Sequence, residues 1–138
     1  MSIRAQILNL LEDMKRRYGL TLLFIAHDLA VVKNVSDRVA VMYLGKLCEV
    51  GAPDVLYAQP AHPYTAALLA AIPVPDPASP PDVAQVLSGE IPSNLNPPSG
   101  CRFRTRCPRA AQRCADEEPV MRELATGHSV ACHFPVRS

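Results

Sequence analysis

The sequence has no strong charge of either sign and no long apolar run. Its 14 Lys and Arg residues face 13 Asp and Glu residues, which leaves a formal net charge of +1. A nearly neutral chain has no general attraction to nucleic acid or to an anionic membrane surface. No apolar run approaches the roughly 20 residues that span a bilayer. The first residues lack the basic segment and apolar core of a signal peptide, so we expect cytoplasmic residence.

Proline and cysteine are abundant but unevenly placed. Eight of the 14 prolines lie between Pro73 and Pro98, and four of the five cysteines lie between Cys101 and Cys132. A proline-dense stretch cannot sustain a helix and is typical of an extended linker. These two biases predict three parts: residues 1–72, a Pro-rich linker at 73–98, and a Cys-rich segment at 99–138.

The first part has the pattern of an α/β protein. Apolar residues at helical spacing predict an amphipathic helix over Ser2–Tyr18, and the unbroken apolar run Leu22–Ala26 predicts a strand buried in a parallel sheet. Proline at the first turn indicates two further short helices. Two short apolar runs joined by a turn signal indicate a β-hairpin. We expect a helix at Leu29–Val35, a hairpin of Val39–Tyr43 and Lys46–Val50, helices at Pro53–Ala58 and Pro63–Ala71, and a short linker strand near Gln85–Ile91.

His27 follows the predicted buried strand directly. The carboxyl ends of strands in open α/β sheets are where ligand-contacting groups lie. The alternative is that His27 is only a polar residue at a strand end. Asp28 has a structural role available as the N-cap of the next helix.

The Cys-rich segment predicts a metal centre. Cys101, Cys107, Cys114 and Cys132 have the spacing C-x5-C-x6-C-x17-C, and four thiols in a short loop-rich stretch indicate a metal site or disulfides. A reducing compartment argues against disulfides. Four thiolates suit Zn²⁺ or an iron–sulfur cluster. Structural zinc sites usually have tight C-x2-4-C knuckles, which are absent here, so we favour an iron–sulfur cluster.

Arginines crowd the same segment, at positions 102, 104, 106, 109 and 113. They can offset the negative charge of a thiolate-bound cluster and donate hydrogen bonds to sulfur. Nucleic-acid binding is the alternative, but Phe103 is the one aromatic residue between Cys101 and Cys114 for base stacking. We expect no nucleic-acid partner, and a cluster that fixes the fold rather than transfers electrons.

Several stretches together resemble the C-terminal portion of the ATP-binding subunit of oligopeptide and dipeptide ABC importers. They are Ser2–Leu11, Thr21–Leu29, Ser36–Tyr43, His62–Thr65, Gly89–Ser93, Pro97–Pro108 and His128–His133. The resemblance implies that His27 is the switch histidine, which contacts the γ-phosphate of ATP and helps to position the attacking water. It implies that His62–Thr65 opens a C-terminal extension, whose four cysteines hold a [4Fe-4S] cluster in some members.

The resemblance also implies partners that the chain itself does not contain. They are ATP with Mg²⁺, a second ATP-binding subunit, and transmembrane permease subunits at the cytoplasmic side of the bacterial inner membrane. The subunit would lie peripherally there and couple ATP hydrolysis to peptide uptake. Relatives that import nickel or another small solute share the ATPase portion, so the solute stays open.

The sequence departs from the family in one respect. The phosphate loop G-x-x-x-x-G-K-[ST] is absent: near Gly45-Lys46, position 40 is Ala and position 47 is Leu. The signature and Walker B motifs are missing too, although Leu87–Glu90 superficially resembles the former. We therefore expect a fragment of a longer subunit that alone neither binds ATP tightly nor hydrolyses it. The alternative is a stand-alone, non-enzymatic module that binds an iron–sulfur cluster or zinc.

Overall fold

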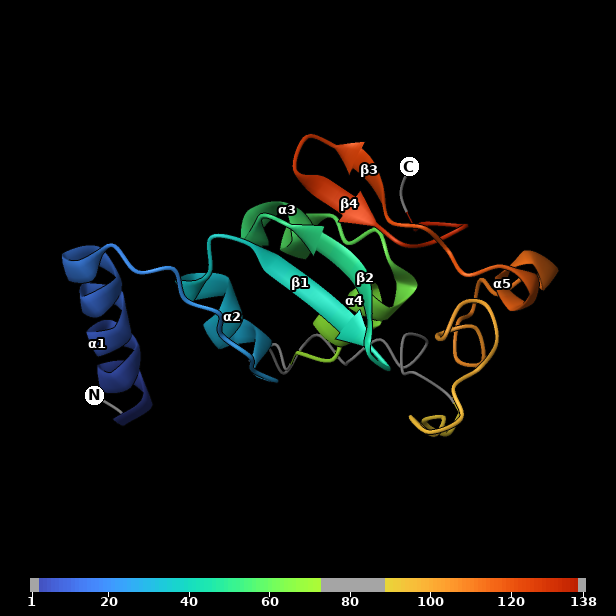
Figure 1. Ribbon diagram of the computed structural model, residues 1–138, viewed down its shortest axis with the longest axis horizontal. Helices are drawn as coiled ribbons and strands as arrows, with labels where there is room; N and C mark the ends of the chain where they lie inside the picture. Colours follow the sequence, from blue (N-terminus) through green and yellow to red (C-terminus); the bar gives the residue numbers. More distant parts are fainter. Residues whose placement is uncertain (1–2, 73–88, 137–138) are drawn as a thin grey trace, which may run out of the picture. The chain divides into compact units, whose positions relative to one another are not determined.

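The computed structural model describes residues 3–72 and 89–136 and divides into two compact units, Met1–Asp37 and Arg38–Ser138 (Figure 1). Each unit is a separate body and is taken by itself below. Among the described residues, no helix combines the length and apolarity needed to cross a membrane.

The first unit contains two helices, α1 (Ile3–Tyr18) and α2 (Leu29–Val35). Both predicted helices are confirmed. Gly19 ends the first helix with a left-handed φ of 62°, which glycine adopts without steric cost. Asp28 caps the second, since its carboxylate accepts a hydrogen bond from the Val31 backbone N–H at 3.3 Å. Ser2, the first residue of the predicted helix, lies outside the described residues.

The segment Leu22–Ala26 is not a strand in this chain. Its residues have irregular backbone and are exposed, with Leu23 at 92% and Ile25 at 89% of full exposure. The prediction of a buried parallel strand is therefore wrong here. The physical reason is that a strand needs a neighbour for its backbone N–H and C=O groups, and the described part of this unit contains no other strand.

The second unit is built on a four-stranded antiparallel sheet in the order β1-β2-β4-β3. Its strands are β1 (Val39–Tyr43), β2 (Lys46–Gly51), β3 (Arg122–Ala125) and β4 (His128–Val130). The predicted hairpin of β1 and β2 is confirmed. Leu44 and Gly45 both have positive φ, 45° and 76°, which is the backbone of the tight turn that suits a two-residue hairpin.

The β3–β4 hairpin extends the sheet formed by the first hairpin. Glu49 pairs with Val130, and Val50 with Ser129. The Ala131 N–H continues the ladder by donating to the Cys48 carbonyl at 2.8 Å. The fold is thus mixed α/β with an antiparallel sheet, and the sequence analysis did not anticipate this pairing. Of the predicted linker strand, residues 89–91 are not a strand, and 85–88 lie outside the described residues.

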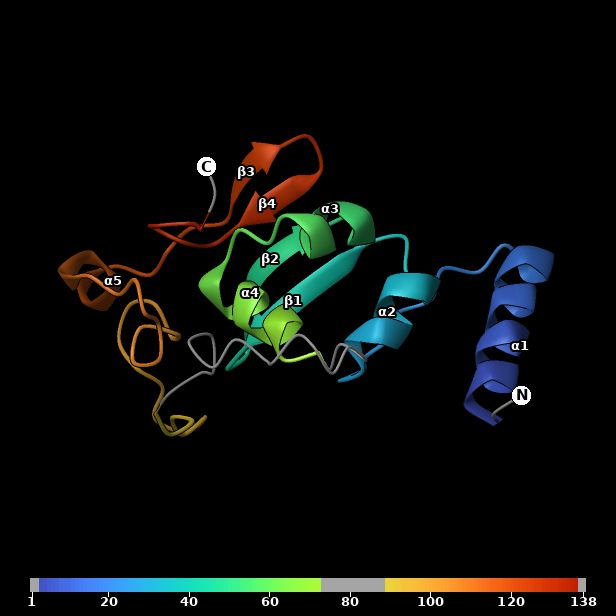
Figure 2. The same ribbon diagram turned by 180° about the vertical axis from the view of Figure 1, so that it is seen from behind.

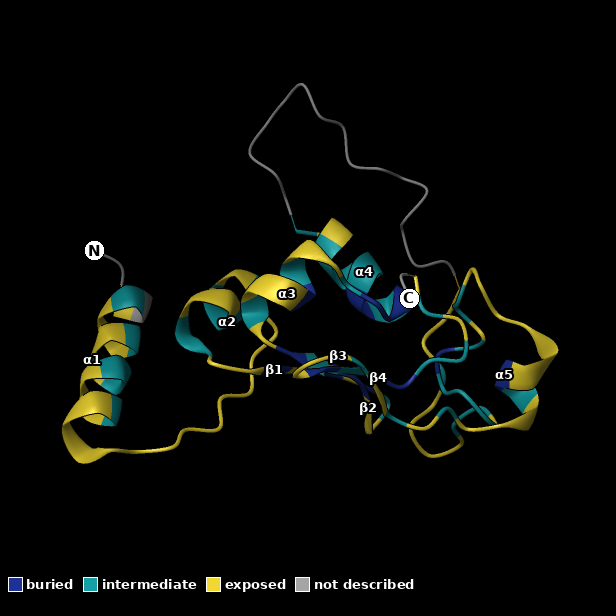
Figure 3. Cartoon of the chain, turned by 90° about the horizontal axis from the view of Figure 1, so that it is seen from above, coloured by how far each residue is buried: buried dark blue, intermediate teal, exposed yellow. Residues whose placement is uncertain are grey.

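Helices α3 (Pro53–Ala58) and α4 (Pro63–Ala70) lie on one face of this sheet (Figures 2 and 3). Both were predicted, α4 ending one residue earlier than expected. The Cys-rich segment adds one short helix, α5 (Gln112–Asp116). Its Phe103 is 1% exposed and packs edge-on against Tyr43 of β1, with ring centroids 5.2 Å apart. Burial of this ring fastens the Cys-rich segment to the sheet.

Candidate functional site

The four predicted cysteine ligands line one small pocket, together with His62, Arg104, Arg109 and His133. Cys101 and Cys107 come from a loop of consecutive turns, Cys114 lies on α5, and Cys132 follows β4. The four positions span 32 residues of sequence, so the fold is what gathers them. That these four thiols hold one metal centre stays a prediction.

The backbone fixes two of the four thiols relative to each other. The Cys101 N–H donates to the Cys114 carbonyl at 2.7 Å. Gly100 precedes this contact with φ 62°, and a Cβ there would lie 2.4 Å from the Cys114 oxygen. A side chain at position 100 is therefore excluded both by the left-handed backbone and by the close approach.

Three thiols of this pocket have raised pKa values. Burial raises the pKa of Cys101 and of Cys107, and it raises the pKa of Cys132 to about 11. Mutual repulsion among the neighbouring thiolates adds to the rise, while the Arg109 charge opposes it at Cys107. Buried, mutually repelling thiolates need a cation for stabilisation, and a bound metal supplies one.

The pocket has the donors of a four-thiolate centre but not its coordination geometry. All five cysteines are free. Within the described ranges, no three His, Cys, Asp or Glu side chains are grouped closely enough to hold a metal ion. The cavity volume is about 10 Å³, room for roughly one water-sized atom. The four cysteines match such a centre in residue type and number, but the structure does not group them as ligands.

Glu49 is a fully buried carboxylate beside this pocket. It is 0% exposed and accepts three hydrogen bonds: from the Ala61 N–H at 2.8 Å, the His62 N–H at 2.9 Å and His128 Nε2 at 2.7 Å. Strand β2, the turn before α4 and strand β4 therefore meet at one side chain. His128 therefore hydrogen-bonds to Glu49. His133 instead lines the cysteine pocket, and its Nε2 contacts the Glu117 carbonyl at 3.0 Å.

His62 caps α4 and is itself buried. It is 2% exposed, and its Nδ1 accepts the Tyr64 N–H at 3.0 Å. Burial lowers the pKa of His62 to about 4, although the Glu49 charge acts in the opposite direction. The ring is therefore neutral at physiological pH. The sequence analysis did not assign this role to His62, and the signal for it was the place of His62 before Pro63, where an N-cap acceptor is needed.

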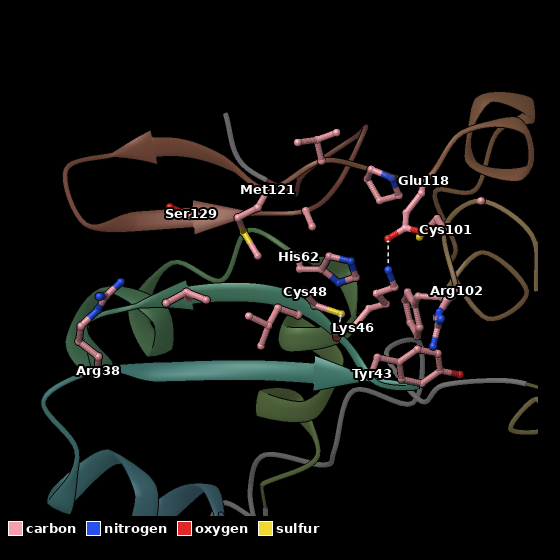
Figure 4. Close-up of a pocket in the computed structure, with 17 residues that line it drawn as sticks. Arg38, Tyr43, Lys46, Cys48, His62, Cys101, Arg102, Glu118, Met121 and Ser129 are labelled. Atoms are coloured by element: carbon pink, nitrogen blue, oxygen red, sulfur yellow. Dashed lines mark hydrogen bonds and ion pairs between the residues drawn. The ribbon is translucent and has the colours of Figure 1, made fainter. Parts of the chain in front are cut away.

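A larger cavity of about 570 Å³ lies between the sheet and the Cys-rich segment (Figure 4). Lys46 and Glu118 form an ion pair there at 2.6 Å. Cys48 lines it and is buried, and burial raises its pKa to about 12. The sequence analysis did not single out this fifth cysteine. Arg102 ties the Cys-rich loop to the β1–β2 turn by donating to the Leu44 carbonyl.

His27 lies apart from these features in the chain, in the unit Met1–Asp37. It is exposed, at the bend between the irregular segment and α2. An exposed imidazole is free to meet a ligand that another part of a protein holds. Among the described residues of this unit, His27 does not belong to a group of side chains that could hold a metal ion.

Comparison with known proteins finds relatives over nearly the whole length of the chain. Residues 48–114 match the family described as the oligopeptide/dipeptide transporter, C-terminal region. The oligopeptide transport ATP-binding protein OppF of Escherichia coli is 56% identical over 133 residues, which is 96% of this chain and 40% of that protein. Its Salmonella typhimurium counterpart is 55% identical over 137 residues, with the same shares.

These relatives are longer than the chain. It spans about two fifths of the length of the curated relatives it matches, those from Brucella included. The names of these relatives describe peptide import or oligopeptide transport and ATP binding, and they contain no metal. Over nearly its whole length the chain is similar to ATP-binding proteins of peptide transport, and residues 48–114 match the family model described as the oligopeptide/dipeptide transporter, C-terminal region.

Proposed function

We propose that this chain is the C-terminal portion of an ATP-binding subunit that couples ATP hydrolysis to peptide uptake. The observation that carries the proposal is the 56% identity to an oligopeptide transport ATP-binding protein over 96% of the chain. In the complete assembly, a second ATP-binding subunit and permease subunits are its partners, at the cytoplasmic face of the bacterial inner membrane. ATP and Mg²⁺ bind through motifs that the chain lacks.

Each of the three parts of the sequence has its own role in this proposal. Residues 1–72 complete the ATPase domain, residues 73–98 link it to the rest, and residues 99–138 form the extension. The exposed apolar run Leu22–Ala26 supports the first assignment. Apolar residues left in water cost about 25 cal/mol per Å², and a neighbouring strand from the missing part of the domain would remove that cost. The apolar face of α1, with Ile3 at 76% and Leu10 at 59% exposure, has the same need.

His27 acts in this proposal as the γ-phosphate contact at the end of that strand. Its imidazole N–H stabilises the charge that develops on the transferred phosphoryl group and orients the attacking water. The residue is exposed in the present chain, so the contact requires the nucleotide held by the rest of the subunit.

Changing His27→Ala in the complete importer is expected to lower ATP hydrolysis and peptide uptake about 100-fold, the scale of losing one preorganised donor. The measurements are phosphate release and uptake of a labelled peptide into proteoliposomes. The unfolding temperature should stay within a degree or two of wild type, because the side chain is exposed. Asn34→Ala, an exposed change on α2, serves as the matched control. Unchanged hydrolysis in the His27 variant would remove this residue from the mechanism.

For the extension, we propose a [4Fe-4S] cluster held by Cys101, Cys107, Cys114 and Cys132, with Zn²⁺ as the alternative. The support is that all four thiols are free and line one pocket. A bound cluster supplies a multivalent cation that stabilises the thiolates. The residues around it keep water out and balance its charge, with Arg104 anchored on the Ser99 carbonyl at 2.9 Å.

Anaerobically purified chain is expected to contain about four iron and four sulfide per molecule and to absorb broadly in the visible. One zinc per chain without colour would replace the cluster by the zinc alternative. A chain purified from iron- and zinc-supplemented cells with neither metal would refute the centre. This outcome would leave the peptide-import assignment standing, since that assignment rests on homology.

A further inference from the structure

The larger cavity of the second unit lies on the face of the sheet that α4 does not cover. Its volume is about 570 Å³, within the range of roughly 300–1,000 Å³ typical of small-ligand sites. Glu49 and His128 point to the side of α4, because Glu49 also accepts the Ala61 N–H in the turn before that helix. Side chains alternate along a strand. Val50 and Ser129, which follow them, therefore lie on the opposite side, where they line the cavity.

The cavity is polar at its two ends and apolar between them (Figure 4). Arg38 and Ser129 lie at one end. The ion pair of Lys46 and Glu118 lies at the other end. The five residues of β1 separate Arg38 from the turn before Lys46, a length of about 17 Å. The apolar lining between the ends comprises Leu47, Val50, Val120, Met121 and Ala131. This shape and lining suit an elongated ligand with polar ends and an apolar middle.

Arg38 and Ser129 have donors to offer such a ligand. Among the described residues, neither side chain has a hydrogen bond or an ion pair. A guanidinium and a hydroxyl at the same end of a cavity are a donor set for a carboxylate, and hydrogen bonds to an ionised acceptor belong to the stronger class. The charge of the lining agrees, since three cationic side chains line the cavity against one acidic side chain. The cavity therefore attracts an anion.

We propose that this cavity binds a short apolar peptide, with the C-terminal carboxylate of the peptide at Arg38 and Ser129. The side chains of the peptide leave water against the apolar middle. Its amino end lies near the Lys46–Glu118 pair, whose side chains are 47% and 56% exposed and rearrange at little cost. A fatty acid offers the same carboxylate but would place its methyl end against that ion pair. This site depends on neither the bound nucleotide nor the metal centre.

An NMR titration of the isotope-labelled full chain with trileucine tests the site. Trileucine should shift the amide signals of Val50 and Ser129. Trileucine amide lacks the carboxylate and should bind about tenfold more weakly or worse, because a charge-assisted hydrogen bond is lost. N-acetyl-trileucine keeps the carboxylate and should bind within about fivefold of trileucine, because an exposed pair between its amino end and Glu118 would contribute little.

Two arginine variants test the residue that receives the carboxylate. Arg38→Met keeps the apolar stem and removes the charge, so it should weaken trileucine binding about tenfold or more. Its unfolding temperature should stay at the wild-type value, because Arg38 is exposed. Arg122→Met is the matched control, since Arg122 is an exposed arginine of β3 that does not line the cavity. This variant should bind trileucine as the wild type does.

Three results would overturn the proposal. Equal affinity for trileucine and its amide, or wild-type affinity in Arg38→Met, would remove the carboxylate site. Octanoate that binds more tightly than trileucine and displaces it would assign the cavity to a fatty acid instead. Unchanged signals of Val50 and Ser129 with every probe would show that the cavity binds none of them. The peptide-import assignment would stand in each case, because it rests on sequence similarity to ATP-binding proteins.

Discussion

Replacing Cys114 by serine is expected to abolish stoichiometric metal binding and to unfold the Cys-rich segment. Cys114 is 6% exposed and its carbonyl holds the Cys101 N–H, so the thiol is the most firmly placed of the four. Serine keeps the size and removes the thiolate. The loss of a direct ligand should exceed the roughly 10–100-fold affinity loss that follows removal of an outer-shell partner. Metal and sulfide analysis per chain measures it.

The same variant should unfold at a lower temperature than the loaded wild type. Residues 99–138 contain few large apolar side chains, so metal binding supplies much of their folding free energy. A ligand at 100 times its Kd stabilises by about 2.7 kcal/mol, which is a shift of about 10 °C or more in a domain of this size. Circular dichroism follows the transition.

Two controls make this result specific. Cys48→Ala removes the buried fifth cysteine, which lies outside the quartet, and should leave metal content unchanged. Chelator-treated wild type and Cys114→Ser should unfold together, because the difference between them is the metal. If Cys114→Ser keeps a full complement of metal, or if Cys48→Ala loses it, the assignment of ligands is wrong.

Glu49→Ala is expected to be the most destabilising single change in the second unit. The carboxylate is fully buried and accepts from two backbone N–H groups and from His128. Its removal leaves all three buried donors without an acceptor. Breaking a buried pair of this kind costs about 3–5 kcal/mol. Thermal or urea unfolding of the chain measures the change. The β3–β4 hairpin and α4 should lose protection from hydrogen exchange together, since one side chain joins them.

Glu118→Ala is the matched control for that experiment. Glu118 also forms an ion pair, with Lys46 at 2.6 Å, but its side chain is 56% exposed. Exposed pairs contribute about 0–1 kcal/mol, so this variant should unfold close to wild type. Equal stability of the two variants would show that Glu49 is not the junction of the three elements.

Local pattern in the sequence was enough to predict most helices and the first hairpin. Asp28 confirms the expected N-cap because such signals act within one turn of the backbone. The spacing of the cysteines was enough to select them as a set. The prediction of a strand at Leu22–Ala26 was wrong because strand formation depends on a neighbour that the pattern does not contain.

The amino-acid sequence by itself determined which residue types are present and where short-range order begins and ends. The tertiary structure alone decided that β4 pairs with β2, that four thiols from distant positions line one pocket, and that Glu49 and His62 are buried beside it. The physical reason is range. Caps and turns are set by neighbours in the chain, whereas burial, and the pKa shifts and pairing it imposes, depends on contacts between segments about 80 residues apart, such as Glu49 and His128.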